Sequence, residues 1–128
     1  EDIGLANPNA LLMAQTCFES IRVIGNPESR IILAQTVIYL ACSPKSNSAY
    51  LAINKAMDFV QKTGDLSIPL HLRNAPTRLM KDLNYGADYK YPHDFPGNFV
   101  TQNYFPDGYE KPNFYAPGDN PNEAKLKR

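Results

Sequence analysis

The strongest constraint on the fold is a helical period that recurs through the first half of the chain. Apolar residues there return every three or four positions, as on the buried face of an amphipathic helix. Glycine or proline interrupts the pattern between segments and marks where each helix ends. The pattern predicts three helices, over about residues 8–24, 27–43 and 46–62.

Two asparagine–proline pairs, Asn7-Pro8 and Asn26-Pro27, precede the first two of these helices. In each pair, asparagine is expected to cap the free N–H groups and proline to occupy the first helical position. A shorter fourth helix is expected over residues 76–86. The best strand candidate, residues 66–72, has a proline in its middle and does not alternate convincingly. The sequence therefore predicts an all-α fold.

The segment 27–43 differs from its neighbours because it is apolar on almost every side. Only Gln35 and Thr36 form a thin polar strip along it. Such a helix is expected to be buried on several sides, either by its own chain or by another subunit. Its candidate interface residues are Ile31, Val37, Ile38 and Leu40.

The composition changes over residues 84–121, which hold ten aromatic residues and six prolines. Proline at this density excludes long helices, and disordered linkers are poor in aromatic residues. We therefore expect one domain over residues 1–128, in which a helical bundle (1–86) is followed by an extended arm (87–128). The arm is expected to run over the bundle or over a neighbour, and to fray at its polar end, residues 123–128. Its candidate interface residues are Tyr91, Phe95 and Phe99.

Charge and length narrow the class of protein. The chain has 128 residues with 13 basic and 13 acidic side chains, so no broad basic footprint for nucleic acid is expected. No apolar run is long enough to cross a membrane, and no signal segment opens the chain. Cys17 and Cys42 fall within helical patterns, which favours a reducing, cytoplasmic location over a disulfide framework. A first residue other than methionine suggests a piece of a longer protein.

The sequence predicts no catalytic residue, no metal site and no bound cofactor in this chain. No glycine is followed by lysine, so the phosphate-binding loop of nucleotide hydrolases is absent. The histidines and cysteines are single residues without ligand spacing, and both cysteines are expected to pack on apolar helix faces. His93 and Asp94 could form an acid–base pair, but neighbours in an extended segment point opposite ways. His93 is therefore expected to be a turn or interface residue.

A few basic residues remain candidates for contacts with nucleic acid or a partner protein. Lys45 lies beside a predicted helix start, where free N–H groups could meet a phosphate, although the same residues also serve simply to break one helix and begin the next. Further along, basic residues alternate with aromatic ones, which is typical of single-strand binding, but Asp82, Asp88 and Asp94 oppose it. The candidates are Lys45, Arg73, Arg78, Lys90, Tyr91 and His93.

Three stretches resemble a known family. The chain opens with EDIGLANP, continues with VIYLA followed by PKSNSAY, and later has PLHLRNA followed by YKYPHD. These stretches resemble, in order and over nearly the whole chain, the C-terminal region of the RarA/MgsA family of replication-associated recombination AAA+ ATPases. Eukaryotic relatives of this family include the Werner-helicase-interacting protein.

The resemblance implies an all-helical domain that follows the ATPase core, is similar to the clamp-loader collar, and assembles the protein as a homotetramer. It implies a parent that is a DNA-dependent ATPase at stalled replication forks, with ATP and Mg²⁺ bound in the core outside this chain. DNA and replication proteins such as single-strand-binding protein are then the expected partners of the parent. The leading hypothesis is a non-catalytic oligomerisation domain. The alternative is a module that itself binds single-stranded or junction DNA, or a replication protein.

Overall fold

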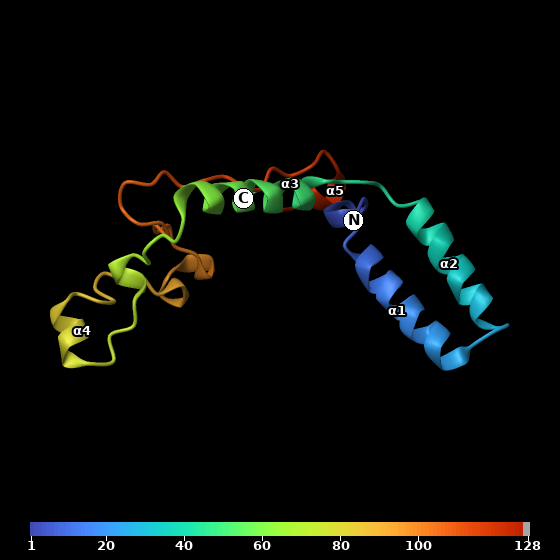
Figure 1. The fold of residues 1–128 in the computed structure, drawn as a ribbon, viewed down its shortest axis with the longest axis horizontal. Helices are drawn as coiled ribbons and strands as arrows, with labels where there is room; N and C mark the ends of the chain where they lie inside the picture. Colours follow the sequence, from blue (N-terminus) through green and yellow to red (C-terminus); the bar gives the residue numbers. More distant parts are fainter. Residues whose placement is uncertain (127–128) are drawn as a thin grey trace. The chain divides into compact units, whose positions relative to one another are not determined.

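The computed structural model describes residues 1–126, and every regular element within them is helical. The prediction of an all-α fold is therefore confirmed for the described residues. Four short 3-10 turns accompany the α-helices, at Gly4–Ala6, Leu70–Leu72, Pro92–Asp94 and Pro96–Asn98. The α-helices, labelled in Figure 1, are α1 (Asn9–Ile24), α2 (Ser29–Ala41), α3 (Ser48–Thr63), α4 (Arg78–Asp82) and α5 (Pro121–Ala124).

The chain forms two compact units. The first consists of Glu1–Asp58 together with Phe114 and the residues after it, and the second consists of Phe59–Asn113. Helices α1, α2 and α5 and most of α3 belong to the first unit, while α4 belongs to the second. In sequence, the second unit is thus an insertion into the first.

Neither asparagine caps its helix as predicted. The side-chain amide of Asn7 instead donates to Tyr39 Oη and to Ser43 Oγ, both at 3.0 Å, and so ties the start of α1 to the end of α2. Asn26 Oδ1 accepts a hydrogen bond from Ser29 Oγ at 3.0 Å rather than from a backbone N–H. Tertiary partners have taken the polar atoms that local capping would use.

The fourth helix is shorter than predicted, and no strand forms over residues 66–72, where a 3-10 turn lies. Helix α4 has only five residues and begins at a cap, since Thr77 Oγ1 accepts from Met80 N at 3.3 Å. It ends early because Asn84, at φ +59°, already occupies the left-handed region that does not continue a helix.

A carboxylate closes the first unit. Glu123 is fully buried, and its Oε1 accepts hydrogen bonds from Ser48 Oγ at the start of α3 and from Tyr115 Oη at 3.0 Å. Its Oε2 accepts from Asn120 Nδ2 at 2.5 Å. We call Ser48, Tyr115, Asn120 and Glu123 the Glu123 clasp. The prediction of a frayed end is wrong for residues 123–126, while 127 and 128 lie outside the described residues.

Hydrogen bonds keep the Glu123 carboxyl group ionised. Burial raises the pKa of Glu123, but hydrogen bonds from Ser46, Ser48, the Gly118 backbone and Asn120 outweigh it and lower the pKa from 4.5 to about 2. Burial, together with the neighbouring Glu123 carboxylate, raises the pKa of Tyr115, so its hydroxyl stays a donor. The clasp is therefore a buried carboxylate that keeps its charge because donors surround it.

A further hydrogen bond joins the last described helix to the beginning of the chain. Asn122 Nδ2 donates to the backbone oxygen of Ala6 at 2.6 Å. Gly118 leaves room for the carboxylate, since a Cβ there would lie 2.6 Å from Glu123 Oε2. Ala6, like Glu123, is fully buried, so the small core of this unit includes residues from near both ends of the described chain.

Candidate functional site

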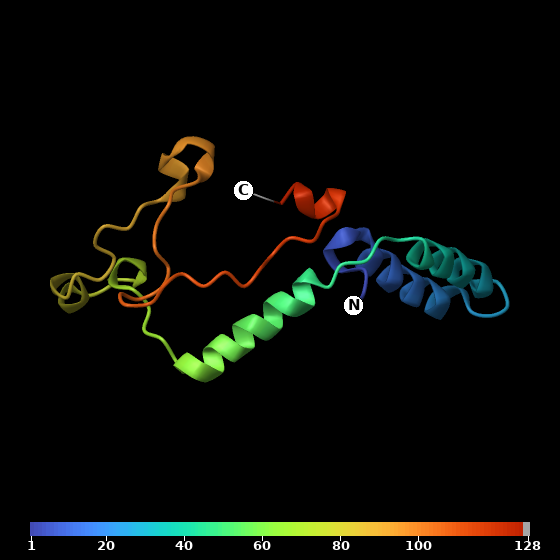
Figure 2. The same cartoon turned by 90° about the horizontal axis from the view of Figure 1, so that it is seen from above.

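Helices α1 and α2 form an antiparallel hairpin in which small side chains make the seam. The two helices lie side by side in both views of the ribbon (Figures 1 and 2). The buried residues of α1 are Ala10 and Cys17, and those of α2 are Ser29 and Thr36. Within each pair the two residues are seven positions apart, which is nearly two helical turns, so both lie on the same face of their helix. Small residues on such lines allow two helices to pack closely.

The opposite face of α2 is apolar and open. Ile31 and Ile38 are also seven residues apart, lie on the far side of the helix from Ser29 and Thr36, and are 67% and 65% exposed. Ala34 lies between them on the same face. The prediction that the chain itself buries this helix on several sides is wrong, because Ser29 and Thr36 pack inward while Ile31 and Ile38 face out. Of the predicted polar strip only Thr36 is buried, and Gln35 is exposed beside Ile31. Burial by another subunit stays a prediction.

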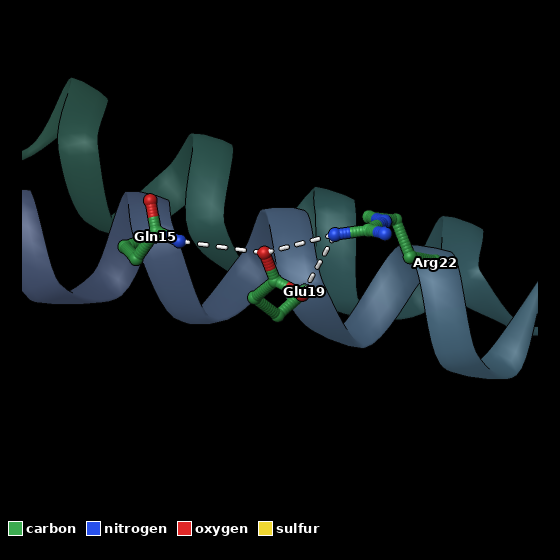
Figure 3. A network of polar contacts seen from close by, with 3 residues as sticks. All are labelled: Gln15, Glu19 and Arg22. Carbon is green, nitrogen blue, oxygen red and sulfur yellow. Dashed lines mark hydrogen bonds and ion pairs between the residues drawn. The ribbon is translucent and has the colours of Figure 1, made fainter.

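The far side of α1 carries a polar network instead. Gln15 Nε2 donates to Glu19 Oε1 at 3.5 Å, and Arg22 Nη1 lies 3.2 Å from Glu19 Oε2 (Figure 3). The three residues lie on the side of the helix opposite Cys17. The ion pair is more than half exposed and contributes little to stability. The polar network suits this part of α1 to water, although Leu12 and Val23 on the same helix are 66% and 84% exposed. The outer face of α2 carries no such network in the described contacts.

The other predicted interface residues lie apart from this face. Val37 is 56% exposed on a flank of α2, while Leu40 is half-buried and lines an apolar groove of the first unit. Tyr91, Phe95 and Phe99 belong to the second unit, where Tyr91 and Phe99 are more than half exposed. Of the predicted interface residues, Ile31 and Ile38 therefore share the outer face of α2. An interface role for Tyr91, Phe95 and Phe99 stays a prediction.

Two of the predicted basic contacts already have partners within the chain. Lys45 Nζ lies 3.8 Å from the Asp2 carboxylate. Arg73 donates from Nε to the backbone oxygen of Ile68 at 2.7 Å and from Nη1 to Tyr85 Oη at 3.2 Å. Its guanidinium also lies 5.0 Å from the centre of the Tyr85 ring, so Arg73 holds the second unit together.

Lys90 lines a polar cavity of about 550 Å³ in the second unit. His71 and Gln102 also line it, and sequence reasoning did not select them for a shared site, because they come from segments 31 residues apart. Gln102 Oε1 is buried there without a hydrogen-bond partner, although its Nε2 donates to Lys90 O at 3.1 Å. The remaining lining residues are Leu70, Asn84, Ala87, Asp88 and Asn103.

The other predicted contact residues do not line this cavity. The rings of Tyr91 and His93 lie together, with their centres 5.1 Å apart, and Arg78 is the first residue of α4.

The cysteines differ in their surroundings. Cys17 is buried in the hairpin seam as predicted, but Cys42 follows the last residue of α2 and is exposed, so its predicted packing is wrong. Across residues 1–126, no three His, Cys, Asp or Glu side chains gather as metal ligands would. None of the described helices is both long enough and apolar enough to cross a membrane.

Comparison with known proteins connects this fold to a family. The family described as "MgsA AAA+ ATPase C terminal" matches residues 1–128. Replication-associated recombination protein A of Coxiella burnetii is 45% identical over 128 residues, which cover 99% of this chain and 29% of that protein. The Escherichia coli K12 protein of the same name is 37% identical over 98% of this chain and 28% of its own length.

A eukaryotic protein is also similar. ATPase WRNIP1 of Dictyostelium discoideum is 40% identical over 116 residues, which cover 90% of this chain and 13% of that protein. The chain therefore spans less than a third of the length of each of these relatives. It belongs to the MgsA AAA+ ATPase C-terminal family and is the C-terminal domain of a RarA/MgsA-type AAA+ ATPase.

Proposed function

We propose that this domain assembles its parent ATPase into a homotetramer by burying the outer face of α2 between subunits. The observation that carries the proposal is the inverted burial of this helix. Ser29 and Thr36 are buried, whereas Ile31 and Ile38 are about two-thirds exposed. Burying an isoleucine side chain contributes about 1.5–3 kcal/mol, so a face left open in the monomer favours association.

The spacing on α2 favours a second helix as the occupant. Ile31, Ala34 and Ile38 recur at intervals of three and four, which is the pattern of a seam between packed helices. A two-fold axis would place the same residues of two copies against each other, as closed oligomers do. The hairpin seam and this outer face would then give α2 a partner on both sides.

Assembly suits the activity that the names of the relatives suggest for the parent. Several ATPase modules joined through this domain would act on one DNA junction at a high local concentration. In this proposal the domain itself is non-catalytic, and ATP and Mg²⁺ bind in the part of the parent outside it. DNA and replication proteins such as single-strand-binding protein are proposed as partners of the parent.

Charge on the outer face is expected to break the assembly. Ile38→Asp places a carboxylate where the proposal buries an apolar side chain, so the parent should change from tetramer to a smaller species. The mutated side chain is 65% exposed in the monomer, so helix content should stay unchanged. Light scattering on a sizing column measures the mass, and circular dichroism measures the helix content.

A matched variant separates this effect from added charge alone. Ile68 is 60% exposed and lies in the second unit, so Ile68→Asp should leave the mass unchanged. A folded Ile38→Asp protein that remains fully tetrameric would overturn the proposed interface.

A second candidate function is binding of a single strand at the cavity of the second unit. It is favoured by Lys90 and by the buried, unpartnered Gln102 Oε1, which can accept from the N–H of a base. Asp88 in the same lining works against a phosphate, which is why this candidate ranks second.

The single-strand candidate predicts that Lys90→Ala weakens binding of a labelled oligonucleotide by about threefold to tenfold, and that wild-type affinity falls as salt rises. Lys62→Ala, an exposed lysine at the end of α3, is the matched control and should change nothing. Fluorescence anisotropy measures both. Absence of binding at low salt would remove this candidate.

A further inference from the structure

The first unit contains an apolar groove that the proposed assembly does not use. It has a volume of about 910 Å³ and takes lining residues from α1, α2 and α3. Leu11, Tyr50 and Ile53 line it and are 79%, 54% and 56% exposed. None of them lies on the Ile31–Ile38 face of α2. The groove is therefore a separate surface, and its apolar side chains are open to solvent in the single domain.

The first residues of the chain also line this groove. Glu1, Asp2 and Ile3 are among its lining residues. They are held in place, because Ser46 N donates to Asp2 O at 2.9 Å and Lys45 Nζ lies 3.8 Å from the Asp2 carboxylate. The chain thus enters the domain at the margin of the groove and in a fixed position.

The relatives indicate what lies before this point. The family is defined as the C-terminal part of AAA+ ATPases, and the chain spans only 28–29% of the bacterial relatives. A region that is C-terminal to an ATPase has that ATPase before it in the chain, upstream of the residue that corresponds to Glu1. The segment directly upstream of Glu1 therefore starts at the margin of the groove.

We propose that the groove binds the segment of the parent chain immediately upstream of Glu1. Because this segment is covalently attached at the groove, its effective concentration there is in the millimolar range. A separate protein would need a bulk concentration of about the same size to compete with it. The apolar lining calls for apolar side chains in this segment, and the carboxylate of Glu1 favours a basic residue near it. Docking would fix the orientation of the preceding ATPase module relative to this domain.

Photo-crosslinking in the full-length parent tests the proposal. A benzoylphenylalanine at Ile53 should give, after irradiation, a product of monomer mass on a denaturing gel. Mass spectrometry should place its cross-link within the residues just upstream of Glu1. The control position is Val23, which is 84% exposed on α1 and does not line the groove, and it should give no such product. A product of dimer mass, a cross-link elsewhere in the chain, or no cross-link at Ile53 would overturn the proposal.

A second measurement does not depend on the crosslinker. Ile53→Asp should release the segment and raise the rate of limited proteolysis upstream of Glu1 by about tenfold or more, because cleavage follows the open population. Val23→Asp should leave the rate unchanged, and an unchanged rate in Ile53→Asp would also overturn the proposal. The mass of the assembly is measured separately, so failure of the groove and failure of the α2 interface are distinguishable.

Discussion

Replacing Glu123 by alanine should lower the melting temperature of the protein by about 10 °C or more. The substitution removes the acceptor of Ser48, Tyr115 and Asn120 at once, and it leaves a cavity where the carboxylate was fully buried. Buried donors without an acceptor are strongly destabilising. Thermal unfolding followed by circular dichroism measures the effect.

An exposed glutamate provides the control for this substitution. Glu110→Ala removes the same charge from an exposed position and should shift the melting temperature by no more than about 2 °C. Equal melting temperatures for the two variants would show that the Glu123 clasp does not hold the first unit closed.

The pH dependence identifies the carboxylate as the cause. The folded pKa of Glu123 is about 2, below its ordinary 4.5, so folding favours the ionised form. Its contribution to stability is therefore complete above pH 4.5 and is lost as the pH falls through about 2. Urea unfolding at about pH 6 and about pH 3 should show a smaller pH effect in Glu123→Gln than in the wild type.

Gly4→Ala should destabilise the protein by about 3 kcal/mol, for two additive reasons. Gly4 has φ +49°, a left-handed conformation that costs a residue with a Cβ about 1 kcal/mol. Its Cβ would also lie 2.7 Å from the backbone oxygen of Ser46, which has little freedom to move because Ser46 N bonds Asp2 O. Equilibrium denaturation in urea measures the free energy of unfolding.

Gly64→Ala separates the two contributions. Gly64 follows α3 with φ +65°, but nothing lies within 4 Å of the position its Cβ would take. This variant should therefore cost only about 1 kcal/mol, the conformational part. Equal losses for the two variants would mean that the contact between Gly4 and Ser46 contributes nothing.

The helical period of the sequence predicted α1, α2 and α3 well because their apolar spacing is local information. It could not predict the orientation of α2, since a helix that is apolar on nearly every side does not specify which face turns inward. The buried residues of both helices are small, Ser29 and Thr36 on α2 and Ala10 and Cys17 on α1, which suits close packing of the two helices.

The sequence contains a local signal for the helix that carries Glu123, although the polar composition of residues 123–128 predicts a frayed end. Asn120, Pro121 and Glu123 form a helix start, with a capping asparagine, proline at the first position and glutamate at the third. Asn120 Oδ1 indeed accepts from Glu123 N at 3.0 Å. No local pattern indicates that Glu123 pairs with Ser48, because Ser48 is 75 residues away in the sequence.

The closure also sets an order for folding during synthesis. The helices α1 and α2 can pair as soon as residues 1–43 have left the ribosome, because their contacts lie within that stretch. The contacts of Ala6 and Ser48 with Asn122 and Glu123 must wait until the whole inserted second unit has been made. For roughly eighty residues of translation, at about 5–20 residues per second, the hairpin would therefore stand with its outer face open and its own unit incomplete.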